Sequence, residues 1–175
     1  MYKPENYDGA EAATFGNTDR PPAGPYLMKI FGERETISRN SQKPMLELLL
    51  DIAQGQYADF FQELGNQIGK SCLLRHYRLL TDEQSNYLKG DISSIEKSNA
   101  GFKYDFSDGS LIGKRVGANL QEEEYYNSEG EVKTSLKIAF LFPITDIAKI
   151  KPMPKKCLPK RDATIPAPGS DGLPF

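Results

Sequence analysis

Aromatic residues stand beside basic residues at several places in the sequence. This pairing occurs at Tyr26 and Lys29, Arg75-His76-Tyr77-Arg78, Phe102-Lys103-Tyr104, and Tyr125-Tyr126 before Lys133 and Lys137. Single-stranded nucleic acid binds where bases stack on aromatic rings while Lys or Arg contacts phosphates, and each stacked base contributes about 1–3 kcal/mol. The pattern therefore predicts a surface for single-stranded nucleic acid.

The candidate binding residues divide by chemistry into cations for phosphates and rings for bases. The expected phosphate contacts are Lys29, Arg39, Lys43, Arg75, Arg78, Lys103, Lys114, Arg115, Lys133 and Lys137. The expected stacking residues are Tyr77 and Tyr104, whose neighbours are polar or charged, followed by Tyr57 and Tyr125. The alternative for any aromatic residue is core packing, which we favour for Phe60, Phe140 and Phe142.

Catalytic and cofactor motifs are weak in this sequence. Gly65-Asn66-Gln67-Ile68-Gly69-Lys70-Ser71 has three residues between its glycines, where a phosphate-binding loop needs four. Glu122-Glu123-Glu124 would split between the two faces of a strand, so exposed charge on a strand explains it better than a metal site. Cys72 and His76 are only two ligands, and we expect His76 to be an ordinary surface or packing residue. We expect no catalytic residues, no metal and no cofactor.

Length and composition indicate one domain with polar ends. The chain has 175 residues, with 38% hydrophobic and 26% charged residues. No apolar run approaches the ~20 residues of a membrane span, and the N-terminal residues lack the apolar stretch of a signal peptide. The only two cysteines, Cys72 and Cys157, lie far apart. We therefore expect a reduced, cytoplasmic protein with no membrane contact.

Charge is unevenly distributed along the chain, although the formal net charge is only −2. Residues 149–175 contain six basic side chains, Lys149, Lys151, Lys155, Lys156, Lys160 and Arg161, against Asp162 and Asp171. Such a block can meet an anionic polymer, because the local field matters more than the total charge. A solvated tail explains the charge pattern equally well.

Hydrophobic periodicity outlines the secondary structure. Period-two alternation predicts strands around Tyr26–Phe31, Leu46–Ala53, Val116–Gln121 and Val132–Phe142, and a third, shorter strand around Tyr57–Glu63. Thr81-Asp82-Glu83-Gln84 fits a capping box, and Leu88, Ile92 and Ile95 follow at helical spacing, so we expect a helix at 82–98. The polar residues 1–22 are typical of a flexible arm, and the Pro-rich residues 151–175 of a disordered tail.

The expected order is three strands, a helix and two strands, within a folded domain at 23–150. This is the order of an OB-fold, a five-stranded barrel with a helix between its third and fourth strands. Other small mixed α+β sheets share the same order. The sequence therefore predicts a mostly β protein, with an OB-fold-like barrel as its most specific interpretation.

The last residues, Gly169-Ser170-Asp171-Gly172-Leu173-Pro174-Phe175, resemble the C-terminal tip of bacterial single-stranded DNA-binding proteins. That tip ends a Gly/Pro-rich tail with acidic residues, an aliphatic residue, Pro and a terminal Phe. The resemblance implies that Asp171, Leu173, Pro174 and Phe175 bind partner proteins, with the Phe175 ring in an apolar pocket and its carboxylate on a basic residue. The acidic cluster of the bacterial tip is reduced here to Asp162 and Asp171, which implies weaker or different partner selection.

Four stretches also resemble a family of bacteriophage proteins from replication and recombination modules. They are PAGPYLMKI, LELLLDIAQGQYADFF, DISSIEKSNAGFKYDF and GKRVGANLQEEEYYNSEGEVKTSLKIAF, and they span most of residues 22–150. The resemblance implies a non-enzymatic phage single-stranded DNA-binding protein of OB type that works in the host cytoplasm. It would coat single-stranded DNA and recruit replication or recombination proteins through its C-terminal tip.

Three points stay open at this level. The chain could be a replisome adaptor that binds only proteins, or a small metal-dependent nuclease that uses its carboxylates. It could also form homo-oligomers, which nothing in the pattern decides.

Overall fold

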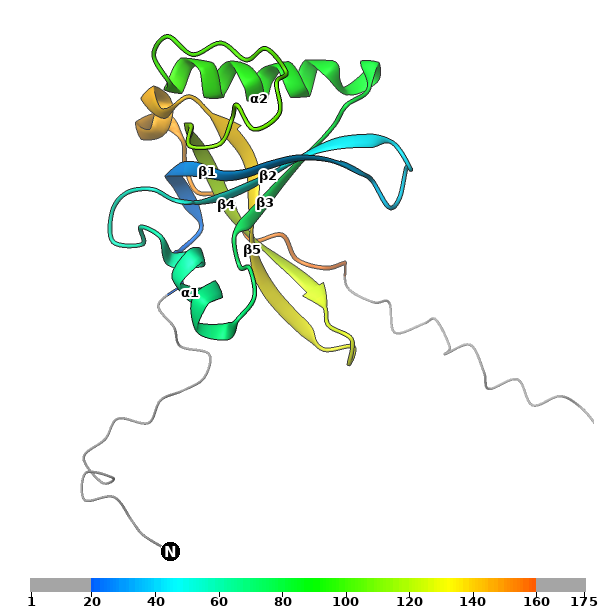
Figure 1. The fold of residues 1–175 in the computed structure, drawn as a ribbon. Coiled ribbons are helices and arrows are strands. Elements are labelled where there is room, and N and C mark those ends of the chain that lie inside the picture. The colour runs from blue at the N-terminus through cyan, green and yellow to red at the C-terminus, as the bar shows by residue number, and fades with distance from the viewer. Residues whose placement is uncertain (1–19, 160–175) are drawn as a thin grey trace, which may run out of the picture.

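The computed structural model describes residues 20–159, which form one antiparallel sheet with two α-helices (Figure 1). The strands, in sheet order β3-β2-β1-β4-β5, are β3 (Leu74–Leu79), β2 (Pro44–Ile52), β1 (Gly24–Ile37), β4 (Arg115–Tyr126) and β5 (Val132–Phe142). The expected mostly β architecture, with a helix between the third and fourth strands, is confirmed. The sheet is open between its edge strands β3 and β5, although residues of both line one cleft.

The core lies on one face of the sheet, as the alternating pattern predicts. Met28 and Ile30 of β1 are buried there, together with Leu46, Leu48, Leu50 and Ile52 of β2 and Val116, Ala118 and Leu120 of β4. β1 is the central strand, because its first half pairs with β4 while most of its length pairs with β2. Its register shifts between Ile30 and Gly32, so that the alternation of β1 changes phase at this bulge.

The expected third strand at Tyr57–Glu63 is wrong, because this region leads into helix α1 (Phe60–Ile68) and the third strand is β3. Asp51, at the end of β2, explains the helix. Its carboxylate accepts hydrogen bonds from the backbone N–H groups of Phe61 (3.2 Å) and Gln62 (2.7 Å), and so satisfies donors that a helix start leaves free. Phe61 and Gly65, four residues apart, are the buried positions of α1.

Helix α2 (Ser85–Ser98) follows β3 and covers part of the core face with Ile92 and Ile95. The helix expected at 82–98 is therefore present, but its start differs from a capping box. Thr81 makes no side-chain capping hydrogen bond, and Asp82–Gln84 form a turn of 3₁₀ helix, η1. Gly90 lies inside α2 and is exposed.

Residues 151–159, which we call the strap, run beside β4 instead of beginning a disordered tail at residue 151 (orange in Figure 1). They follow a second 3₁₀ turn, η2 (Ile144–Lys149). The β1–β4 ladder ends at Leu120, so β1 does not pair with the part of β4 that follows. The strap fills this place: the Glu124 N–H donates to the Lys156 carbonyl (2.9 Å), and the Lys156 N–H to the Glu122 carbonyl (2.8 Å).

Candidate nucleic-acid interface

The candidate interface lies on the face of β1, β2 and β3 opposite to the core, which we call the outer face. The strand register places Arg34 of β1 beside Glu47 of β2, and Glu47 beside Tyr77 of β3. Arg75 lies two residues before Tyr77 on the same face of β3. Three strands therefore bring two guanidinium groups and a phenol ring around one carboxylate.

Glu47 is the buried centre of this group, with only 1% of its surface exposed. Its Oε1 accepts a hydrogen bond from the Tyr77 hydroxyl (2.9 Å) and lies 3.5 Å from Nη1 of Arg75, while its Oε2 accepts from Nε of Arg34. Burial alone would raise the pKa of Glu47. The hydrogen bonds from Arg34 and Tyr77, together with the positive charges of Arg34 and Arg75, outweigh burial and hold that pKa below its usual value. Glu47 is therefore an anion at neutral pH.

The groups around Glu47 remain accessible from solvent. The exposed fractions are 62% for the side chain of Arg34, 51% for that of Arg75 and 42% for Tyr77. A cleft of about 540 Å³ opens above them, and the turn between β1 and β2 contributes Ser38, Arg39 and Asn40 to its wall. Exposed cations beside a half-exposed ring can bind a phosphate and an unpaired base together.

A second cleft, of about 480 Å³, continues from the first along the open seam between β3 and β5. Arg75 and Tyr77 line both clefts, and Lys137 of β5 lines the second. Nζ of Lys137 also lies 3.6 Å from Oε1 of Glu123. Such an ion pair at the surface contributes little to stability. Of the predicted binding residues, Arg39, Arg75, Tyr77, Arg78 and Lys137 therefore line one or both of these clefts.

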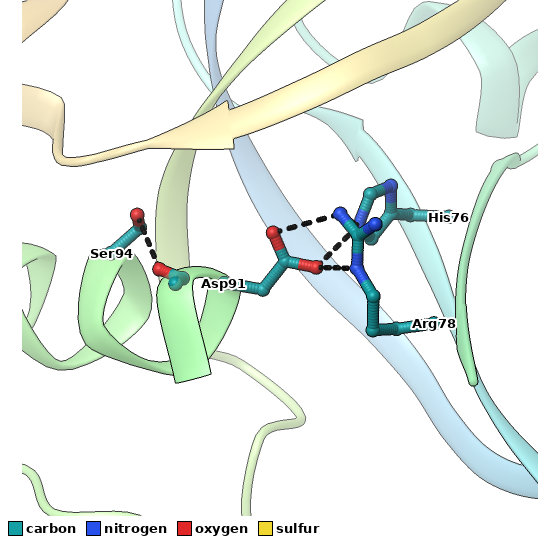
Figure 2. Close-up of polar contacts among 5 residues, drawn as sticks. His76, Arg78, Asp91 and Ser94 are labelled. Atoms are coloured by element: carbon teal, nitrogen blue, oxygen red, sulfur yellow. Dashed lines mark hydrogen bonds and ion pairs between the residues drawn. The ribbon is translucent and has the colours of Figure 1, made fainter. Parts of the chain in front are cut away.

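Arg78 also lines the second cleft, but its guanidinium is bound on the other face of β3. Its guanidinium donates to both carboxylate oxygens of Asp91 in α2, from Nε at 2.6 Å and from Nη2 at 3.2 Å. His76 lies on the same face, and its Nε2 is 2.8 Å from Asp91 (Figure 2). His76 is buried, as a packing residue would be, and Arg78 has a structural role that ties β3 to α2.

Tyr104, Lys103 and Lys114 lie on the segment between α2 and β4, and Tyr104 lines a third cleft of about 570 Å³ that Arg34 also borders. The Tyr104 hydroxyl donates to Glu33 (2.9 Å), and its ring packs against the core and contacts Phe106. Burial and the bond to Glu33 raise the pKa of Tyr104. Lys103 pairs with Glu96 (2.8 Å), and Lys114 lies over the Phe102 ring. The geometry gives Tyr104 a packing role.

The remaining candidates are spread over four other places. Lys29 and Arg115 are paired across the β1–β4 ladder and are both exposed. Tyr57 packs against the core, with its ring edge-to-face with those of Tyr26 and Phe60. Tyr125 and Lys133 face each other near the tip of the β4–β5 hairpin, and Lys43 pairs with Glu83 (3.7 Å). These residues form no single surface with Tyr77.

Two residues of the outer face, Arg34 and Glu47, escaped the sequence analysis. Arg34 stands in Glu33-Arg34-Glu35, which looks like a charge-balanced strand and has no aromatic neighbour. Glu47 carries the stronger signal, because it interrupts the apolar run Leu46–Leu50. A carboxylate inside a largely buried strand needs a partner, and that need would have pointed to a cationic neighbour.

No group of three or more metal-binding side chains occurs within residues 20–159. Neither α1 nor α2 has the length and apolar character needed to cross a membrane, and the same holds for the rest of the described chain. The predicted partner-binding residues Asp171, Leu173, Pro174 and Phe175 lie outside the described residues. Comparison with models of protein families and with curated proteins found no match.

Proposed function

We propose that the protein is a non-enzymatic single-stranded DNA-binding protein whose DNA lies along the outer face of β2 and β3. The observation that carries this proposal is the cleft in which Arg34, Arg75 and the Tyr77 ring surround the buried Glu47. The guanidinium groups contact phosphates and the Tyr77 ring stacks on a base, while Arg39 and Lys137 extend the basic path in opposite directions.

The strand arrangement supports an OB-fold interpretation. The order β3-β2-β1-β4-β5 is that of an OB barrel opened between β3 and β5, and these two strands approach each other across a cleft. OB-folds are partly open barrels that bind oligonucleotides on the face of their second and third strands, between the loops that follow the first and fourth strands. The proposed DNA path follows this face and passes the β1–β2 turn.

The resemblances in the sequence extend the proposal to a biological setting. The protein would act in phage replication or recombination in the host cytoplasm. The C-terminal residues Asp171, Leu173, Pro174 and Phe175 would recruit replication or recombination proteins.

Fluorescence anisotropy with a labelled oligothymidine and a duplex of equal length, at two salt concentrations, tests the proposal. We expect tighter binding of the single strand and an affinity that falls steeply with salt, because each phosphate contact releases counterions. Tyr77→Ala should weaken binding by about 1–3 kcal/mol, the contribution of one stacked base.

The matched control is Tyr87→Ala, which removes another half-exposed tyrosine, on α2 and outside both clefts. This variant should bind like the wild type, and circular dichroism should show that both variants are folded. Equal affinity for single strand and duplex, or equal effects of the two substitutions, would contradict the proposed stacking. Absence of binding even at low salt would contradict the proposed function itself.

A further inference from the structure

Glu47 stands in an unusual environment for a carboxylate. It interrupts the apolar run Leu46–Leu50 of β2 and is almost completely buried, yet it lies on the outer face and not in the core. A buried ion pair is weak evidence for stability, since well-packed apolar residues of similar volume often stabilise a protein as well or better. Stability alone therefore does not account for Glu47.

The contacts of Glu47 order the three groups that the proposed function uses. Glu47 accepts hydrogen bonds from the Tyr77 hydroxyl and from Nε of Arg34, and it lies at longer range from Nη1 of Arg75. A guanidinium has five N–H donors, so this contact leaves both terminal nitrogens of Arg34 and at least one of Arg75 available for another acceptor. Glu47 thus binds one side of each guanidinium, while the remaining N–H donors of that guanidinium stay exposed.

We propose that Glu47 is the positioning residue of the DNA-binding face, an inference that rests on the proposed function. Glu47 holds the two guanidinium groups and the Tyr77 ring in the arrangement that a phosphate and its neighbouring base meet. DNA then binds without first having to order these long side chains, which would otherwise cost conformational entropy. The face is preorganised by a residue that itself repels DNA.

Because Glu47 repels DNA, the direction in which the Kd changes on its substitution tests the inference. Glu47→Gln removes one negative charge beneath the cleft, so simple electrostatics predicts tighter binding of the polyanion. Loss of positioning predicts weaker binding, because a glutamine amide cannot replace the carboxylate toward Arg34, Arg75 and Tyr77 together. The two explanations therefore predict opposite changes in Kd.

The experiment measures the Kd of the full chain for labelled oligothymidine at two salt concentrations. We expect Glu47→Gln to bind about tenfold more weakly, the scale expected when two long side chains must be ordered during binding. The matched control is Glu33→Gln, which makes the same charge change on the opposite face, where Glu33 accepts from the Tyr104 hydroxyl and the Leu111 N–H (both 2.9 Å). Its Kd should not increase.

Two further measurements keep the inference falsifiable if Glu47→Gln fails to fold. Tyr77→Phe keeps the ring and removes its hydroxyl, which bonds to Glu47 and interacts with Arg75. This variant should bind about threefold more weakly if the ring loses part of its fixed orientation. In the wild type without DNA, the Nε–H group of Arg34 should give a sharp, exchange-protected NMR signal.

The outcomes distinguish the inference from the proposed function. Unchanged or tighter binding by folded Glu47→Gln, or wild-type affinity of Tyr77→Phe, would overturn the positioning role while leaving DNA binding intact. An exchange-averaged Arg34 signal in the wild type would overturn it as well. A wild-type protein that does not bind oligothymidine would overturn both the function and the inference.

Discussion

Removal of the Asp91 carboxylate should destabilise the protein far more than removal of an exposed ion-pair partner. Asp91 is buried and accepts hydrogen bonds from Nε (2.6 Å) and Nη2 (3.2 Å) of Arg78, and from His76 Nε2 (2.8 Å). Asp91→Ala leaves the Arg78 guanidinium and the His76 ring without this acceptor. Loss of one partner of a buried ion pair costs about 3–5 kcal/mol.

The lower end of that range applies here because 22% of the Arg78 side chain is exposed, so water can solvate part of its charge. We therefore expect a loss of about 3 kcal/mol in the free energy of unfolding. For a folded body of this size, such a loss lowers Tm by about 10 °C. Urea unfolding, followed by circular dichroism and by tyrosine fluorescence, measures the change, since the sequence has no tryptophan.

The exposed pair between Lys103 and Glu96 provides the matched control. Lys103 is 84% exposed, so Lys103→Ala should cost less than about 1 kcal/mol. If Asp91→Ala lost no more than this control, with an unchanged m-value, the buried network would not hold β3 to α2 as argued.

The same network predicts a pH dependence. Burial alone would raise the pKa of Asp91, but the hydrogen bonds from His76 and Arg78 and the neighbouring charges hold it below its ordinary value. An acid with a lowered pKa in the folded state contributes stability above its unfolded pKa and loses it as the pH falls through the folded pKa. Stability should therefore decline below about pH 4, and Asp91→Asn should decline less steeply there than the wild type.

Three further predictions concern the sheet and α2, the strap and the C-terminal residues. Gly117→Ala should destabilise the protein by about 2 kcal/mol or more, because a Cβ there would overlap the buried Phe142 ring. Gly90 has open space around it, so Gly90→Ala should stabilise α2 by about 0.5–1 kcal/mol. Thermal melts compare the two variants, and equal shifts in Tm would contradict the packing argument. Truncation after Ile150 should cost about 1–2 kcal/mol, because it removes the backbone hydrogen bonds of the strap to Glu122 and Glu124. Deletion of Gly169–Phe175 should leave Tm unchanged and the affinity for single-stranded DNA equal or slightly higher. Pull-down of host replication proteins should fail with this variant. Loss of DNA binding with partner capture intact would contradict the proposal that the sheet binds DNA and the C-terminal residues bind partners.

Features encoded by neighbouring residues could be predicted from the sequence. The alternation of Leu46, Leu48 and Leu50, and that of Val116, Ala118 and Leu120, identifies strands and their core faces, because successive side chains of a strand point to opposite sides. The helical spacing of Ile92 and Ile95 likewise identifies α2. No strand was expected at Leu74–Leu79, so only the structure shows that Arg75 and Tyr77 share one face of β3.

Features that depend on contacts between distant residues could not be predicted. Helix α1 begins where Asp51, ten residues before Phe61, supplies a hydrogen-bond acceptor for its free N–H groups, so a short amphipathic segment became a helix instead of a strand. The strap is ordered because β1 ends its pairing with β4 at Leu120 and leaves an edge for residues 151–159. Neither cause is visible in the segment that it orders.

The candidate site shows the same division most clearly. The sequence by itself determined that Tyr77 follows two residues after Arg75, since residue type and order are local properties. Only the tertiary structure decided that Arg34 joins them. The bulge between Ile30 and Gly32 changes the phase of β1, so Arg34 faces outward although Met28 and Ile30, at even positions on the same strand, face the core. Strand register then places Arg34 beside Glu47, and Glu47 beside Tyr77, because a backbone ladder aligns residues that are far apart in the chain.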